Sequence, residues 1–96
     1  MKVHWQRLAI ADLQEVRSYI ERDNPYAART VVLKILDAVD RLADFPGLGR
    51  PGRVPNTREL VVSDTPYIAP YRVRNNEVDI LRVYHHARSW PKRFQD

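Results

Sequence analysis

Three stretches in the C-terminal half decide the fold of this chain: Arg58-Glu59-Leu60-Val61-Val62, then Tyr67-Ile68-Ala69-Pro70-Tyr71-Arg72-Val73, then Val78-Asp79-Ile80-Leu81-Arg82-Val83-Tyr84. Each run is rich in β-branched and aromatic residues, and turn residues separate the runs, so the pattern predicts three strands in an antiparallel meander over about residues 57–86. Proline cannot donate to a neighbouring strand, so Pro70 predicts an edge position or a bulge. The third strand is expected to continue directly into His85-His86-Ala87-Arg88.

The N-terminal half predicts an antiparallel helical hairpin over about residues 8–44. Apolar residues recur there at intervals of three and four, as on one face of a helix. Asn24-Pro25 predicts the start of the second helix, because Asn can cap a free amide and Pro fits the first helical position. A weak strand at residues 3–6 precedes the hairpin. The expected fold is therefore α+β, with an N-terminal strand and a helical hairpin packed on a C-terminal three-stranded antiparallel meander.

Length and composition predict one domain spanning residues 1–96. The chain has no cysteine, which excludes disulfides and thiolate chemistry and is typical of a reducing compartment. No secretion signal and no run of about twenty apolar residues is apparent, so we expect a cytoplasmic protein away from membranes. We expect neither a cofactor nor a metal site, because His85-His86 lacks the helical spacing that zinc prefers and no phosphate-binding loop is present.

The excess of positive over negative charge lies in the C-terminal half. Residues 1–49 carry seven Lys/Arg against seven Asp/Glu, whereas residues 50–96 carry nine against five, which accounts for the net charge of +4. A basic surface favours an acidic partner, either nucleic acid or an acidic protein.

The arginines on and beside the predicted sheet are the candidate binding residues. A strand holds side chains in fixed alternating directions, so these guanidinium groups are expected to form one cationic surface. The alternative is a solvated face on which each arginine pairs with Glu59, Glu77 or Asp79 in weak surface ion pairs. The tail, residues 87–96, either docks on the sheet or anchors a partner. The candidate target- or antitoxin-binding residues are Arg58, Arg72, Arg82, Arg88, Trp90 and Phe94.

Strand alternation assigns faces to the last predicted strand. Arg82 and Tyr84 would share a face with His86, and Ile80 would lie behind them on that face. Leu81, Val83 and His85 would lie on the other face, which looks like the core side. His85 is then expected to be a core histidine rather than a catalyst.

The chain resembles the RelE/ParE superfamily of type II toxin–antitoxin toxins, and the ParE-like branch more than the RelE-like branch. The carrying residues are Ala11-Asp12-Leu13, Phe45-Pro46-Gly47-Leu48-Gly49-Arg50-Pro51, Arg58-Glu59-Leu60, Tyr71-Arg72-Val73 and residues 78–85. The resemblance implies a toxin that an acidic antitoxin wraps and neutralises, with operator DNA contacted only through the antitoxin.

Within that superfamily, RelE-like members cut messenger RNA in the ribosome and ParE-like members poison DNA gyrase. RNA cleavage needs a base, an acid and cations for the phosphorane. The residues available for these roles are His85, His86, Arg82, Arg88, Arg58 and Tyr84, and the candidate catalytic set among them is Arg82, His86 and Arg88. That set is incomplete, because Ile68 stands where RNase members carry an arginine, and the lysines of the preceding strand are absent. The resemblance therefore favours a gyrase poison, with a ribosome-dependent endoribonuclease or an antitoxin-binding protein of little toxicity as alternatives.

Overall fold

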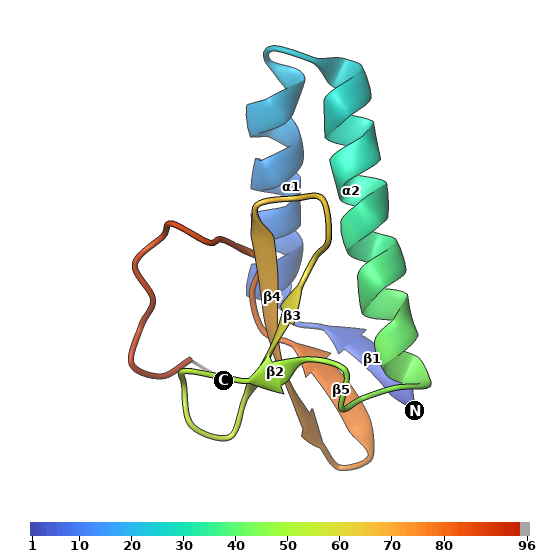
Figure 1. Cartoon of the computed structure of the whole chain (residues 1–96), viewed down its shortest axis with the longest axis vertical. Coiled ribbons are helices and arrows are strands. Elements are labelled where there is room, and N and C mark those ends of the chain that lie inside the picture. The colour runs from blue at the N-terminus through green and yellow to red at the C-terminus, as the bar shows by residue number, and fades with distance from the viewer. Residues whose placement is uncertain (95–96) are drawn as a thin grey trace.

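The computed structural model describes residues 1–94, in which a helical hairpin lies against a mixed sheet (Figure 1). The predicted α+β class is confirmed, as are the opening strand, the helical hairpin and the three meander strands. In chain order the elements are β1 (Lys2–Trp5), α1 (Arg7–Glu21), α2 (Pro25–Asp40), the 3-10 turn η1 (Arg41–Ala43), β2 (Arg50–Pro51), β3 (Arg58–Val61), β4 (Tyr67–Arg74), β5 (Glu77–Ile80) and β6 (Tyr84–His85).

The strands follow the order β1-β5-β4-β3-β2, and β6 pairs with β4 beyond the end of β5. Neighbours β3, β4 and β5 are antiparallel, as the meander requires. The first strand adds to this sheet in parallel with β5, from Lys2 opposite Glu77 to Trp5 opposite Ile80. A further short strand, β2, forms within the stretch between the second helix and β3.

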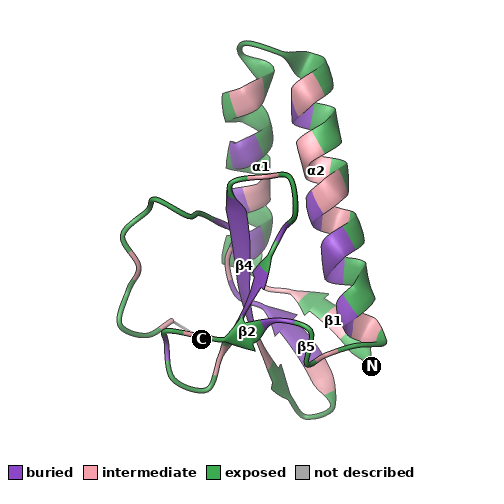
Figure 2. Ribbon diagram, viewed as in Figure 1, coloured by how far each residue is buried: buried purple, intermediate pink, exposed green. Residues whose placement is uncertain are grey.

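The two helices cover one face of the sheet (Figure 2), and the main cluster of buried hydrophobic residues lies between the two layers. Fully burying a Val, Leu, Ile or Phe side chain stabilises a fold by about 1.5–3 kcal/mol, so the residues buried in this layer supply most of the driving force for folding. Its fully enclosed members include Ala9 of α1, Ile35 and Val39 of α2, and Tyr71, Val78 and Ile80 of the sheet.

Local signals in the sequence explain where several elements begin and turn. The Asn24 Oδ1 atom accepts a hydrogen bond from the amide of Ala27 at 3.1 Å, with Pro25 as the first helical residue, so the predicted helix start is confirmed. Asn75 and Asn76 both have positive φ and join β4 to β5 as a two-residue hairpin turn. Asparagine tolerates that conformation better than most residues.

The last predicted strand is interrupted by a bulge. Tyr71 of β4 lies opposite Ile80, whereas Ile68 lies opposite Tyr84. Two residues of β4 therefore face three residues, 81–83, on the other side of the ladder. One extra residue of this kind is a β-bulge, and it reverses the alternation of faces beyond it. The prediction of one continuous strand over residues 78–84 is wrong.

Pro70 lies opposite this bulge, and its carbonyl accepts a hydrogen bond from the amide of Leu81 at 2.9 Å. The predicted bulge is confirmed. The edge position is wrong, because β4 runs through the middle of the sheet with β3 on one side and β5 and β6 on the other.

The connection after the second helix is fixed by one tyrosine. The Tyr71 hydroxyl donates to the Pro46 carbonyl at 2.7 Å and accepts from the Gly49 amide at 2.8 Å. A Cβ atom at Gly49 would lie 2.6 Å from Cε1 and 2.7 Å from the hydroxyl of Tyr71. Glycine is therefore required at residue 49, so that the backbone can approach the ring.

Neither helix in the described part of the chain is both long and apolar enough to cross a lipid bilayer.

Candidate functional site

A buried ion pair joins the first helix to the end of the sheet. The carboxylate of Asp12, which is 7% exposed, binds Arg82 through two contacts, Nε to Oδ2 at 2.7 Å and Nη2 to Oδ1 at 2.9 Å. The amide of Val83 donates to the same Oδ2 atom at 3.0 Å. Hydrogen bonding to Asp12 raises the pKa of Arg82, although burial acts in the opposite direction. The Asp12 carboxylate therefore fixes both the bulge and the Arg82 guanidinium group that projects from the bulge.

The bulge turns Tyr84 toward the sheet face opposite the helices, where guanidinium groups flank its ring. The guanidinium carbon of Arg82 lies 4.8 Å from the ring centroid, and that of Arg88 lies 4.2 Å from it. Trp90 and Phe94 pack against the same ring, with centroids at 5.2 and 6.2 Å. Tyr84 is only 1% exposed as a result. The tail thus docks on the sheet, which is one of the two roles predicted for it. Its last two residues, Gln95 and Asp96, lie outside the described part of the chain.

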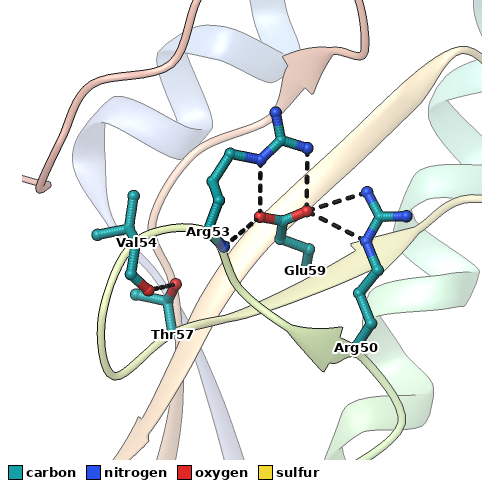
Figure 3. A network of polar contacts seen from close by, with 5 residues as sticks. All are labelled: Arg50, Arg53, Val54, Thr57 and Glu59. Carbon is teal, nitrogen blue, oxygen red and sulfur yellow. Dashed lines mark hydrogen bonds and ion pairs between the residues drawn. The ribbon is translucent and has the colours of Figure 1, made fainter.

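A second buried carboxylate holds the stretch before β3 (Figure 3). Glu59 is 2% exposed and binds two arginines, Arg50 through Oε1 at 3.0 Å and Arg53 through Oε2 at 3.0 Å. The backbone amide of Arg53 also donates to Oε2, at 2.8 Å. The expectation that Glu59 forms a weak surface ion pair is wrong, because the carboxylate is enclosed by this loop. Arg53 also contacts the tail, since its guanidinium carbon lies 3.8 Å from the Trp90 ring centroid.

The pair formed by Glu59 and its arginines predicts a pH-dependent stability. Burial alone would raise the pKa of Glu59, but hydrogen bonds from Arg53 and Arg50 outweigh it and lower the pKa below its ordinary value. A lowered pKa in the folded state stabilises the fold above the unfolded value, and the contribution is lost as the pH falls through the folded value. We expect urea unfolding to show a cost of about 3 kcal/mol for Glu59→Gln near neutral pH, shrinking as the pH falls below about 4.

Glu77→Gln is the matched control for that experiment, because Glu77 pairs with the exposed Lys2 at 4.0 Å. An exposed pair contributes about 0–1 kcal/mol, so its substitution should change stability little at any pH. A cost for Glu59→Gln that stayed constant across the acid range would show that the carboxylate charge does not stabilise the loop.

The remaining predicted arginines lie further along the same sheet. Arg58 donates to the carbonyl of Gly49 at 2.8 Å. Arg72 lies on the face away from the helices, with Nε 3.9 Å from the Asp79 carboxylate, which Arg74 also approaches at 3.8 Å. The pairing predicted for Asp79 is therefore confirmed, although Asp79 is buried at 6% exposure.

The predicted arginines line three adjoining hollows. We call the combined lining of these three hollows the basic track. The first, of about 420 Å³, is lined by Arg82, Arg88 and Arg93, together with the aromatic residues Trp90 and Phe94 of the tail. A second, of about 170 Å³, shares Arg93 and Phe94 with the first and adds Arg72. A third, of about 280 Å³, shares Arg72 with the second and adds Arg58. The predicted cationic surface is thus present, and it includes Arg93, which the sequence reasoning did not select.

The two histidines lie outside this track. The bulge leaves Val83 in the core and His85 on the same side, but His85 lies at the end of the sheet and is exposed. The prediction of a core histidine is wrong, since His85 lines an open hollow between α1 and the end of the sheet and its side chain is exposed. His86 is exposed as well, and its ring stacks on His85 at 4.7 Å. Of the possible ribonuclease set, Arg82 and Arg88 line one hollow, and His86 is not part of its lining.

No group of three or more histidines, acidic residues or cysteines gathers closely enough to hold a metal ion within residues 1–94.

Two site residues had weak signals in the sequence. Asp12 belongs to the Ala11-Asp12-Leu13 motif, but nothing near it in the sequence points to its partner Arg82, which is 70 residues away. Arg53 looked like a loop residue. Its contact with Trp90 depends on two loops meeting across the sheet.

A helical hairpin packed on a mixed sheet is the fold that the resemblance to RelE/ParE superfamily toxins implied. The family model of the ParE toxin of the type II toxin–antitoxin system parDE matches residues 3–90, so the chain belongs to the ParE toxin family. A solved structure described as the chromosomal ParDE TA system from P. aeruginosa has a TM-score of 0.81 and 34% identity, covering 88% of this chain and 95% of that one.

Two relatives are similar over almost their whole length. The Y4kP protein of Sinorhizobium fredii is 48% identical over 91 residues, which is 95% of this chain and 94% of the relative. The toxin RelE2 of Caulobacter vibrioides is 40% identical over 87 residues, 91% of this chain and 97% of the relative. The family model is named after ParE and one of these relatives after RelE, and the chain is a toxin of a type II toxin–antitoxin system.

Proposed function

We propose that this toxin inhibits growth by acting on DNA gyrase and that a cognate acidic antitoxin, encoded with it, neutralises it in the cytoplasm. The observation that carries the proposal is the match to the ParE family across residues 3–90. The basic track and the docked Trp90 support a protein-binding mode of action, because tryptophan and arginine dominate binding hot spots. In this proposal the toxin contacts operator DNA only through the antitoxin.

A reaction containing purified gyrase and plasmid tests this function. The toxin is expected to convert the plasmid to linear or cleaved forms when gyrase is present and to leave it intact when gyrase is absent. Reversal by the purified antitoxin would identify the toxin as the cause. Unchanged supercoiling at saturating toxin would contradict the proposal.

A ribosome-dependent endoribonuclease is the second candidate function, and one observation favours it. Arg82 and Arg88 line the same hollow, and both could contact the phosphate at a cleavage site. Cuts at codon-spaced positions of a translated messenger in a primer-extension assay would support this candidate over gyrase. Normal growth under strong induction, together with tight antitoxin binding, would favour a third candidate, an antitoxin-binding protein of little toxicity.

Two substitutions separate the first two candidates. Trp90→Ala removes the ring that packs between Arg53 and Tyr84, and we expect it to weaken gyrase inhibition by 10-fold or more, as about 2 kcal/mol at a hot spot implies. His86→Ala removes an exposed imidazole and should leave gyrase inhibition unchanged, but it should abolish RNA cutting if this histidine moves the proton. Dose–response curves for gyrase inhibition measure both variants. The opposite pattern, with His86→Ala inactive and Trp90→Ala active, would contradict the gyrase proposal.

A further inference from the structure

The basic track has no negative charge in its lining within residues 1–94. Each of its three hollows is lined by at least one arginine, and none of them by an aspartate or a glutamate. The charged residues that line the track are Arg58, Arg72, Arg82, Arg88 and Arg93.

Two other hollows of the described chain differ in this respect. The hollow between α2 and β3 includes Asp37, Glu59 and Asp64 in its lining. The hollow between α1 and the end of the sheet includes Asp12 and Glu15. Basic residues line these hollows too, but carboxylates accompany them. The lining of the track thus differs from that of these two hollows, although Arg88 also lines the second of them and the Arg72 Nε atom lies 3.9 Å from the buried Asp79 carboxylate.

Within the track, Arg88 and Arg93 can bind an incoming anion. Both side chains are exposed, and neither has a carboxylate partner among residues 1–94. Arg82 is oriented by Asp12 and keeps a 21% exposed side chain. Phe94 and Trp90 are partly exposed beside them. Guanidinium groups next to aromatic rings are the combination that binds phosphates and bases of single-stranded nucleic acid.

We propose that the basic track binds single-stranded nucleic acid through its phosphates, without regard to base sequence. A small anion would fill one hollow, whereas the track continues through three that share lining residues. A phosphodiester chain carries one charge at every nucleotide, so it can meet an arginine in each hollow. An acidic peptide could do so only with carboxylates at suitable positions. This binding does not depend on gyrase being the target.

Fluorescence anisotropy with a labelled oligothymidylate of about 12 nucleotides, a length within known single-strand site sizes, tests the proposal. The full chain is titrated at several salt concentrations from about 50 to 200 mM. Affinity is expected to fall with salt, with a logarithmic slope of about −0.7 for each phosphate that is neutralised. Arg88→Gln and Arg93→Gln should each reduce that slope by about 0.7 and weaken binding at low salt several-fold.

Arg29→Gln is the matched control, because Arg29 is exposed on α2, away from the track, and the substitution removes the same charge. Thermal unfolding of each variant checks that the fold is kept. Equal losses for all three variants would show that only net charge attracts the strand, and no binding at the lowest salt would also overturn the proposal. Equal competition by polyglutamate of matched charge would assign the track to an acidic protein instead.

Oligouridylate in place of oligothymidylate distinguishes RNA from DNA, and either one binding through Arg88 and Arg93 supports the proposal. A chain that poisons gyrase but binds neither strand would retain the proposed function and lose this inference.

Discussion

Asp12→Ala is expected to lower the free energy of unfolding by about 3–5 kcal/mol, the cost of breaking a buried ion pair from one side. The substitution leaves the Arg82 guanidinium without its carboxylate and the Val83 amide without its acceptor. A domain of this kind has a total stability of about 5–15 kcal/mol, so most of the margin can disappear. Urea unfolding followed by circular dichroism measures the loss.

Glu15→Ala is the control for that experiment, because Glu15 lies on the same helix, carries the same charge and is exposed. Its effect should stay within about 0.5 kcal/mol. The double variant Asp12→Ala/Arg82→Met, which removes both charges, should recover part of the stability lost in Asp12→Ala, because no buried charge remains unpaired. A loss for Asp12→Ala no larger than that for Glu15→Ala would show that the pair contributes little.

Gly49→Ala is expected to cost about 2–4 kcal/mol, although it adds a single methyl group. The new Cβ would overlap the Tyr71 ring and lie 2.9 Å from the Glu59 carbonyl oxygen, so the loop must move. Movement breaks the two hydrogen bonds of the Tyr71 hydroxyl in a buried place. Gly47→Ala, two residues earlier, is the matched control, because no atom outside its neighbours lies within 4 Å of its Cβ position.

Gly47→Ala should therefore change stability by about 0.5 kcal/mol or less. Thermal and urea unfolding of the two variants under identical conditions gives the comparison. Equal effects at the two glycines would mean that the backbone conformation, and not the approach to Tyr71, makes glycine necessary in this loop.

The sequence was sufficient wherever a local signal decided the structure. The Asn24-Pro25 cap and the turn residues between β4 and β5 each act over a few residues, and the structure follows them. The sheet order of β3, β4 and β5 followed from their close spacing.

The errors have one common cause, which is pairing between distant residues. An extra residue within 81–83 reversed the faces that simple alternation assigned, so the prediction that Ile80 shares a face with Tyr84 was wrong. The bulge depends on Asp12, 71 residues before the amide of Val83 that it binds. In the same way, Glu59 became buried only because β2 pairs with β3 and brings Arg50 beside it.

For the candidate site, the sequence identified the residue types and most of the arginines. It did not reveal that Tyr84 would be enclosed by Arg82, Arg88 and the tail, because that requires the reversed face after the bulge. Arg53 and Arg93 belong to the site because of contacts between separate loops, which the sequence likewise did not reveal.

The parallel pairing of β1 with β5 has a consequence for how the toxin is made. Lys2 pairs with Glu77 and Trp5 with Ile80, so the first strand must wait for almost the whole chain before it can enter the sheet. Contacts between residues so far apart in sequence slow folding. During synthesis, the sheet is therefore completed only when the last strands have left the ribosome, and a nascent chain cannot reach the folded state while those strands are still being made.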